Sequence, residues 1–496
     1  MKQKKLLPLI MAVCMLLSIL PLTAFATQRP VAAGSTASIT VEQAAKDDEL
    51  SAYKVIDITY NAGTNTLAYT WNSDFADYFN GSTTYNTTVY TVEQFAELAD
   101  DSPELKDLLA NLPAYIVDRT ISPVQIKMVG EDGTATFENL VMGDYFIRPT
   151  STTSIYQLML QKVEPTVVDG VYVIDDITFH AKKTDLTITK TADKTSVTKK
   201  EKVTFTITVD IPTYPSGAVD KTFYISDLLP DGLTLDTDSI SIEGEGAYTP
   251  LPDVAYTLDT TATGDYTFKM SVDNDKYDTS WAVYAGQQLV ITYEATLNDD
   301  TTTEVNVKET NTATFDYSTY PYVGSSHNQK TVSEDVTTFA IRIDKYEKGD
   351  TTHKLANAKF DLYRTAIVDD DISKIVTIPH TSANGILLEA EKETNGDGEV
   401  VFEKYEANGD NYDYYLVETA APSGYNLLTN AIKVNFTDTD VAATAGVYTV
   451  IVENSSGFKL PQTGGTGTAI FSVVGIALMG AAVVLLIVLK KKNYKK

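Results

Sequence analysis

The sequence predicts an all-β protein of tandem immunoglobulin-like β-sandwich domains, the first with a helical insertion. A signal peptide precedes these domains and a transmembrane helix follows them. Three observations support the prediction. Tyrosine, threonine and valine are abundant, with 30 tyrosines in 496 residues, and these residue types favour strands. Short segments alternate apolar and polar residues, as half-buried strands do. One long apolar segment lies near each end of the chain.

The N-terminal apolar segment has the features of a secretory signal peptide. Three lysines precede the apolar residues 6–22, and Ala24 and Ala26 form a small-x-small pattern. A second membrane helix is the alternative, but two prolines interrupt the segment. We therefore expect cleavage after Ala26, which makes residues 1–26 a signal peptide.

The predicted mature chain, residues 27–463, is acidic and lacks cysteine. The single cysteine, Cys14, lies in the signal peptide, so disulfides cannot stabilise the exported protein. The whole chain has 39 lysines and arginines against 67 acidic residues; three lysines precede residue 27 and five follow Thr463, which leaves 31 against 67. This balance argues against nucleic acid as a partner.

The length of the mature chain suggests about three domains of roughly 100–200 residues each. The alternating segments group into three blocks, which we predict to be an N-terminal β-sandwich domain at 27–182, a middle domain at 183–337 and a C-terminal domain at 338–458.

The first block contains the predicted helical insertion. Thr91 is followed by Gln94, and Ser102 is followed by Pro103; both patterns are typical of helix starts. A strand predicted at 171–179 closes the block.

The C-terminal segment begins with Leu460-Pro461-Gln462-Thr463-Gly464. An uncharged apolar run at 469–489 and a lysine-rich tail at 490–496 follow. The run has the length of a membrane-spanning helix, and its basic flank is expected to stay cytoplasmic. The order of motif, span and tail resembles the LPxTG wall-sorting signal of Gram-positive surface proteins. The resemblance implies that a membrane sortase recognises Leu460 and Pro461, cleaves between Thr463 and Gly464, and transfers Thr463 to an amine, so that the membrane holds only a transient precursor.

The third block resembles a collagen-adhesin B-type domain, because it carries the phrase Val-Glu-Thr-Ala-Ala-Pro-Ser-Gly-Tyr at 417–425. The second block, with Lys-Thr-Ala-Asp at 190–193, resembles the related domain of backbone pilins. With the sorting signal, the resemblance is to a sortase-assembled major (backbone) pilin of Gram-positive bacteria, and it covers nearly the whole mature chain.

The resemblance implies autocatalytic Lys–Asn isopeptide bonds, each assisted by an acid. Each of the last two blocks has a lysine in its first strand, an acid in a middle strand and an asparagine in its last predicted strand, and the first and last strands of a sandwich can lie side by side. The candidate sets are Lys190, Asp227 and Asn311 in the second block, and Lys345, Glu418 and Asn454 in the third. The alternative is that these are ordinary polar strand residues.

Elementary chemistry is consistent with such a bond. Burial disfavours the charged ammonium, and a neutral amine is a nucleophile. A buried carboxyl kept protonated can donate to the asparagine carbonyl, and folding supplies the proximity. No cofactor or metal is required. The first block lacks the set, since Arg148 stands where the middle acid would be, so no crosslink is expected there.

Polymerisation requires a lysine on the neighbouring subunit. Backbone pilins use one in a Val-x-Val-Tyr-Pro-Lys-like phrase at the end of the first domain, and the matching segment here reads Ile-Thr-Phe-His-Ala-Lys-Lys at 177–183. His-Ala replaces Tyr-Pro, so Lys182 is the first candidate and Lys183 the alternative. A solvated basic pair in a linker would give the same pattern.

We therefore expect a structural major pilin subunit, joined head to tail by sortase into a fimbria that is covalently anchored to the cell wall. Its partners would be sortase, other copies of the chain, peptidoglycan and minor pilins. The alternative is a monomeric LPxTG-anchored adhesin that binds a host or environmental ligand. A conventional enzyme is not expected, because the four scattered histidines form no metal or catalytic pattern.

Overall fold

The computed structural model describes residues 29–32, 34–98, 102–151, 153–215, 217–244, 255–299, 308–324, 327–368, 370–408, 411–457 and 466–493. The predicted signal peptide, with Ala24 and Ala26, and the sorting signal at 460–464 lie outside these ranges. The chain forms two compact units, the first comprising Met1–Asp193, Val203–Ala295 and Thr310–Glu334, the second Lys194–Lys202, Thr296–Glu309 and Asp335–Lys496.

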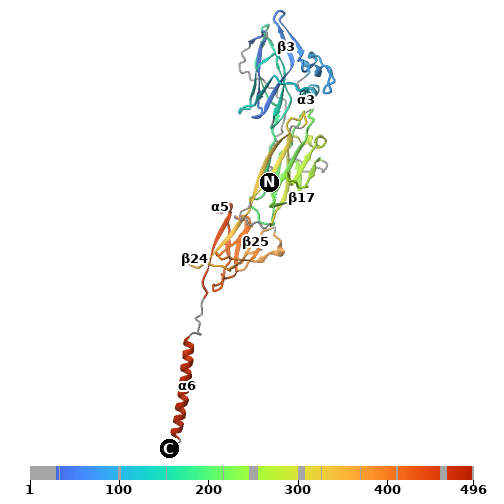
Figure 1. The fold of residues 1–496 in the computed structure, drawn as a ribbon. Coiled ribbons are helices and arrows are strands. Elements are labelled where there is room, and N and C mark those ends of the chain that lie inside the picture. The colour runs from blue at the N-terminus through green and yellow to red at the C-terminus, as the bar shows by residue number, and fades with distance from the viewer. Residues whose placement is uncertain are drawn as a thin grey trace, which may run out of the picture. The chain divides into compact units, whose positions relative to one another are not determined.

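The all-β prediction is confirmed, with helices confined to an insertion in the first block, a few short segments and the C-terminal end (Figure 1). The first block contains β1 (Arg29–Pro30), β2 (Thr36–Glu42), β3 (Glu49–Asn61), β4 (Thr66–Trp71), α1 (Ala76–Phe79), α2 (Val92–Ala96), α3 (Pro103–Asp118), β5 (Gln125–Met128), β6 (Ala135–Val141), β7 (Gly143–Ser151), β8 (Ile155–Tyr156), β9 (Met159–Val163), β10 (Thr166–Val168), β11 (Val171–Ile174) and β12 (Ile177–His180).

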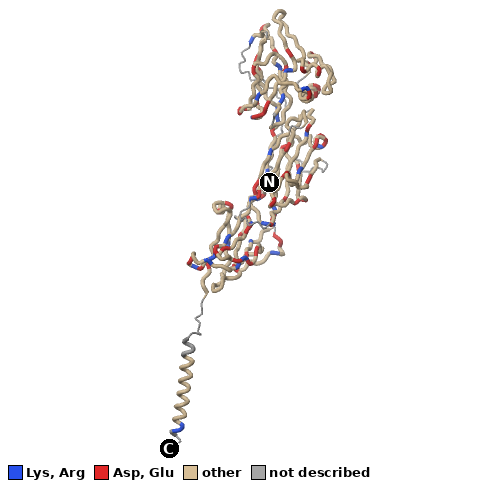
Figure 2. Tube along the Cα trace, in the orientation of Figure 1, with Lys and Arg blue, Asp and Glu red and all other residues tan. Residues whose placement is uncertain are grey.

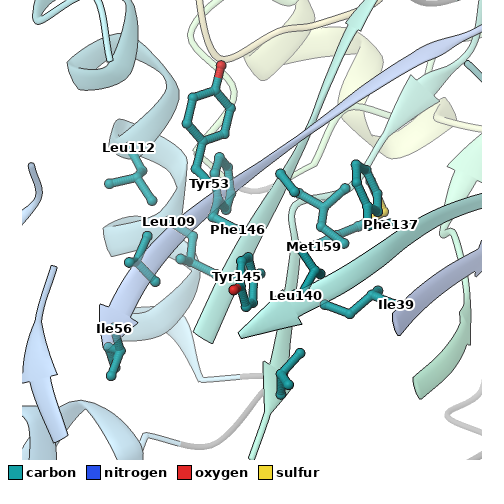
Figure 3. Close-up of a cluster of buried hydrophobic side chains, with 14 of the residues drawn as sticks. Ile39, Tyr53, Ile56, Leu109, Leu112, Phe137, Leu140, Tyr145, Phe146 and Met159 are labelled. Carbon is teal, nitrogen blue, oxygen red and sulfur yellow. The ribbon is translucent and has the colours of Figure 1, made fainter. Parts of the chain in front are cut away.

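The core of the first block lies between its main sheets and the inserted helix. The largest sheet has the order β4-β3-β7-β9, with β5 also paired to β3, and a second sheet has the order β12-β2-β6. Figure 3 shows Leu109 and Leu112 of α3 beside Phe146 of β7, next to Tyr145. Burial of this apolar face holds the insertion against the strands.

Both predicted helix starts are confirmed. The Thr91 hydroxyl accepts from the Gln94 N–H and the Gln94 side chain accepts from the Thr91 N–H, which is a complete capping box at α2. The Ser102 hydroxyl accepts from the Leu105 N–H at 3.2 Å, with Pro103 at the first helical position of α3. Each cap satisfies a backbone donor that has no partner within the helix.

The single strand predicted at 171–179 is wrong, because the structure divides it into β11 and β12, which belong to different sheets. The break falls at Asp175-Asp176, where the Asp176 carboxylate accepts from the Ser38 N–H at 2.7 Å and from Arg29 at 2.9 Å. These contacts hold the chain where it changes sheet, and β12 then pairs with β2 in parallel.

The second block forms two sheets that face each other across a buried interior. The orders are β14-β15-β20-β17 and β18-β19-β16-β21-β22. Its elements are β13 (Lys183–Thr184), β14 (Ile188–Ala192), β15 (Lys202–Asp210), β16 (Phe223–Leu228), β17 (Leu233–Gly244), β18 (Thr257–Asp259), β19 (Phe268–Val272), α4 (Asn274–Lys276), η2 (Tyr277–Trp281), η3 (Ala282–Tyr284), β20 (Gln288–Leu297), β21 (Lys308–Ser318) and β22 (His327–Thr337).

The third block also has two sheets, of orders β24-β23-β28 and β26-β27-β25-β29-β30, and β31 pairs with β23 in parallel. The first and last strands of this block are therefore neighbours. Its elements are β23 (Phe339–Glu347), β24 (Asp350–Lys354), β25 (Lys359–Thr365), η4 (Ile372–Lys374), β26 (Val376–Thr377), β27 (Asn384–Glu393), β28 (Glu399–Tyr405), β29 (Tyr414–Ala420), β30 (Ile432–Val434), α5 (Asp438–Ala442) and β31 (Val447–Asn454).

The predicted C-terminal helix is confirmed as α6 (Thr466–Asn493). Its segment Phe471–Lys491 is long and apolar enough to cross a membrane. Figure 2 shows the helix without charge along its length and with lysines at its C-terminal end.

Candidate functional site

The third block brings Lys345, Glu418 and Asn454 together in its interior. Lys345 lies on β23 and Asn454 on β31, and the parallel register places Lys345 opposite Val452 and Glu347 opposite Asn454. Glu418 comes from β29, in the facing sheet. The side chains of all three are almost completely shielded from solvent, so the structure confirms that these residues meet.

Glu418 contacts both of the other side chains in this set. Its Oε1 lies 3.0 Å from the Lys345 Nζ, and its Oε2 accepts from the Asn454 Nδ2 at 3.0 Å. The Leu428 N–H also donates to Oε2, at 2.8 Å. Although these two atoms are close, neither the Lys345 Nζ nor the Glu418 Oε1 has a hydrogen-bond partner among the described residues.

The buried set favours an uncharged lysine. Burial lowers the pKa of Lys345, although the nearby Glu418 charge acts in the opposite direction. The Phe360 ring lies 5.4 Å from Nζ and forms an apolar wall. The Asn454 Oδ1 is buried and accepts no hydrogen bond from a described residue. A proton on the carboxyl of Glu418 would supply the donor that this oxygen lacks.

The second block brings Lys190, Asp227 and Asn311 together in a different way. Lys190 lies on β14 in one sheet, whereas Asp227 on β16 and Asn311 on β21 are neighbours in the other sheet. The expectation that the first and last strands lie side by side is therefore wrong for this block: β22 follows β21, and the lysine reaches the asparagine across the sandwich. All three side chains are buried.

Tyr293 of β20 connects the three residues of the second block. Its hydroxyl accepts from the Lys190 Nζ at 2.6 Å and from the Asn311 Nδ2 at 2.8 Å, and the nearby Asp227 contributes to raising the pKa of Tyr293. The Lys190 Nζ donates to the Asp227 Oδ2 as well. Sequence reasoning missed Tyr293, because a tyrosine on an alternating apolar strand also fits an ordinary core position; its inward place on β20 is the signal that could have identified it.

Burial shifts both ionisable partners of this set toward their neutral forms. It lowers the pKa of Lys190 and raises the pKa of Asp227, and the attraction between the two opposes both shifts. The Asp227 Oδ1 and the Asn311 Oδ1 are both buried without a hydrogen-bond partner among the described residues. Two acceptors of this kind can be satisfied by one proton placed on the carboxyl. A neutral amine beside a protonated acid and an amide carbonyl can form an amide bond with loss of ammonia.

The two candidate polymerising lysines differ in accessibility. Lys182 is exposed, and its carbonyl accepts from the Gln157 N–H at 2.9 Å. Lys183 lies in β13, pairs with Tyr156 of β8, and directs its amine to the Asp185 carboxylate. Its side chain is only 17% exposed, so Lys182 is the more accessible of the two amines.

The first block contains no comparable set in the part that the structure describes. Its buried polar residues are Asp48, Ser51, Asp144 and Ser154. The Arg148 guanidinium packs over the Tyr320 ring of the second block, 5.2 Å from its centre. Both residues belong to the first compact unit. Arg148 therefore packs against an aromatic ring, whereas the second and third blocks have an acid at the matching place.

Comparison with protein families gives two matches. Residues 340–449 match the SpaA prealbumin-like fold domain, and residues 452–495 match the LPXTG cell wall anchor motif. The first match contains Lys345 and Glu418; the second contains Asn454 and the predicted sorting signal. The chain therefore carries a prealbumin-like domain directly followed by a cell wall anchor motif, which indicates a surface protein attached to the Gram-positive cell wall.

Two related sequences agree with these matches. The chain is 25% identical over 341 residues to the fimbrial subunit type 1 of Actinomyces viscosus, and 24% identical over 274 residues to the trypsin-resistant surface T6 protein of Streptococcus pyogenes. The alignments cover 61% and 52% of this chain. They span 64% and 44% of the two relatives, less than two thirds of either.

Solved structures show the same fold. The T6 backbone pilin of Streptococcus pyogenes, which has a modular three-domain structure, superposes with a TM-score of 0.56 at 19% identity, over 81% of this chain and 80% of that chain. The full-length major pilin SpaD of Corynebacterium diphtheriae gives a TM-score of 0.54 at 15% identity, over 86% and 99%. The prediction of tandem pilin-like β-domains is confirmed; the domain boundaries stay a prediction.

Proposed function

We propose that this chain is a major pilin subunit that sortase polymerises head to tail into a wall-anchored fibre. The observation that carries the proposal is the buried set of Lys345, Glu418 and Asn454, whose asparagine lies at the start of the segment that matches a cell wall anchor. A lysine and an acid whose side chains are both 0% exposed are difficult to explain as a substrate site. They are explained by a bond that stabilises a load-bearing domain.

The internal bond follows from the geometry of each set. In the third block, the Lys345 Nζ attacks the Cγ of Asn454, the Cγ–Nδ2 bond breaks, and ammonia leaves. Glu418 lies against both nitrogens, so it can take the proton that Nζ releases and deliver one to Nδ2. The second block forms the corresponding bond between Lys190 and Asn311 with Asp227 as its acid. The chain thus acts on itself once, in a structural rather than an enzymatic role.

The bond between subunits uses a different lysine. Sortase would cleave between Thr463 and Gly464 and hold Thr463 as a thioester until the Lys182 amine of the next subunit attacks it. The exposed side chain of Lys182 supports this choice, whereas Lys183 is engaged with Asp185. The load would then pass through the second and third blocks, while the first block lies off the path.

The test is an immunoblot of cell wall extracts that have been boiled in detergent. A covalent fibre gives a ladder of high-mass bands, and Lys182→Arg should collapse it to monomer while Lys183→Arg leaves it unchanged. Loss of the ladder in Lys183→Arg alone would move the acceptor to Lys183. A single band near the mature mass in the unmodified strain would contradict polymerisation and favour a monomeric wall-anchored adhesin.

A further inference from the structure

The acids of the two candidate crosslinks differ in reach. Glu418 spans from the Lys345 Nζ to the Asn454 Nδ2 with its two carboxylate oxygens, at 3.0 Å each. Aspartate is shorter by one methylene group. Asp227 accepts from the Lys190 Nζ, but the Asn311 Nδ2 donates to the Tyr293 hydroxyl instead. The leaving nitrogen of the second block therefore contacts a phenol where that of the third block contacts the acid itself.

We propose that Tyr293 is a catalytic residue of the second-block crosslink, in which its hydroxyl carries a proton between Asp227, the Lys190 amine and the departing Asn311 nitrogen. This inference rests on the crosslinking function proposed above. The Tyr293 oxygen lies 2.6 Å from Nζ and 2.8 Å from Nδ2, and the same Nζ donates to the Asp227 carboxylate. One hydroxyl thus contacts both the nitrogen that must lose a proton and the nitrogen that must gain one.

The proton balance of the step closes through this hydroxyl. The Lys190 Nζ forms a bond to the Cγ of Asn311, and the Cγ–Nδ2 bond breaks. The attacking nitrogen gives one proton to the pair formed by Asp227 and Tyr293, and the Tyr293 hydroxyl gives one proton to Nδ2, which leaves as ammonia. The carboxyl and the hydroxyl end with the protons that they held at the start. No oxidant, reductant or cofactor is consumed.

The surroundings of Tyr293 favour transfer within this network over exchange with water. Its side chain is almost completely shielded from solvent, and its ring packs against Phe205 and Phe268 at centroid distances of 5.6 and 5.0 Å. Burial and the neighbouring Asp227 raise the pKa of Tyr293. A free phenolate is therefore disfavoured, and the hydroxyl must release one proton as it accepts another.

The experiment measures crosslink formation in the full mature chain, residues 27–463, made by cell-free translation. Samples are quenched in acidic guanidinium at timed intervals, and tryptic branched peptides report the Lys190–Asn311 and Lys345–Asn454 bonds separately. Positioned proton transfer contributes roughly 10²–10⁴-fold to a rate. Tyr293→Phe should therefore slow the second-block bond at least about tenfold. The third-block bond of the same molecules serves as an internal control and should form at the unmodified rate.

Two further variants separate proton transfer from packing. Tyr277→Phe removes another buried hydroxyl of the second block, one that donates to the Pro212 carbonyl, and should leave the bond rate unchanged. Asp227→Glu combined with Tyr293→Phe gives the second block the longer acid of the third, in the space that the lost oxygen vacates. This double variant should form the bond faster than Tyr293→Phe alone.

Each result decides the question. Three results would overturn the catalytic role of the hydroxyl. The first is an unchanged bond rate in Tyr293→Phe, and the second is a loss of rate in Tyr277→Phe equal to that in Tyr293→Phe. The third is a slow bond in Tyr293→Phe that the longer acid of the double variant does not accelerate. Absence of the Lys190–Asn311 bond from the unmodified chain would instead overturn the crosslinking function on which the inference rests.

Discussion

The second and third blocks place the same three residue types together by different routes. In the third block, lysine and asparagine come from adjacent parallel strands, and a glutamate reaches both nitrogens. In the second block, the lysine reaches across from the opposite sheet, and a shorter aspartate shares the contacts with Tyr293. The same three residue types can therefore be brought into contact inside a β-sandwich by different strand pairings.

The largest expected effect comes from removing the acid while keeping its size. Glu418→Gln and Asp227→Asn should each abolish the bond of their own block and leave the other intact, because an amide cannot shuttle the proton; the loss is on the order of 10²–10⁴-fold in rate. Intact-mass spectrometry measures it, since two bonds lower the mass by about 34 Da and each variant restores about 17 Da. A variant that regains the mass lost in both bonds, or in neither, would contradict the prediction that each acid serves only the bond of its own block.

Removing the asparagine tests what each bond contributes to stability. The two bonds would close loops of about 110 residues in the third block and about 120 in the second, for which chain entropy gives roughly 4–5 kcal/mol each. Asn454→Ala and Asn311→Ala should therefore lower the melting temperature of their own blocks by similar amounts. Calorimetry with the surface variant Asn384→Ala as control measures this. Unchanged melting in Asn454→Ala would mean that Lys345 and Asn454 are not joined.

A smaller effect tests the argument from reach. Glu418→Asp shortens the acid of a block whose Asn454 Nδ2 donates to Glu418 and to the Asn426 carbonyl, and to no tyrosine hydroxyl among the described residues. The bond between Lys345 and Asn454 should form about tenfold or more slowly, because the carboxyl no longer contacts both nitrogens. The rate follows from quenched samples of newly made chain, with the second-block bond as control. Equal rates would show that the length of the acid does not matter.

The smallest effect concerns pH and distinguishes the second block. His327 lies between Asp220 and Asp316, and its hydrogen bonds to them raise its pKa to about 9. A raised folded pKa means that this stabilisation is fully present below the unfolded pKa near 6.5 and is lost as the pH rises through about 9. Because the His327 side chain is partly exposed, the full shift is not realised. The free energy of unfolding of the second block should therefore fall by on the order of 1–2 kcal/mol between pH 6 and 9.5.

Thermal unfolding at the two pH values, with His327→Gln as the insensitive control, measures this loss. A second block whose stability does not change over this range would show that His327 is not charged in the folded state.

The sequence was sufficient to identify the residues that carry strong local signals. Lys345 and Asn454 lie in clearly alternating strands, and Glu418 lies in a distinctive phrase, so the sequence alone locates all three. The helix caps at Thr91 and Ser102 were predicted for the same reason, since capping depends on residues three positions apart.

What the sequence could not predict depends on contacts between distant segments. The inward place of Tyr293 on β20 also fits an ordinary core position, so it does not show that the hydroxyl faces three polar side chains from other strands. The sequence also does not predict that Lys190 and Asn311 lie in opposite sheets, because alternation predicts which face of a strand is buried and not which strands pair. The break at Asp176 depends on its contacts with Ser38 and Arg29, more than 130 positions away.

The pairing of β23 with β31 also determines how a fibre built from this chain would respond to a protease. The described residues between them include Val368 and Ile372, which are 100% and 85% exposed and are obvious points for cleavage. If Lys345 is joined to Asn454, a cut at either point opens a closed ring of chain and leaves the path from β23 to β31 covalent. Damage on the outside of the third block would then not sever the filament, and only cleavage in the segments outside the rings could shorten it.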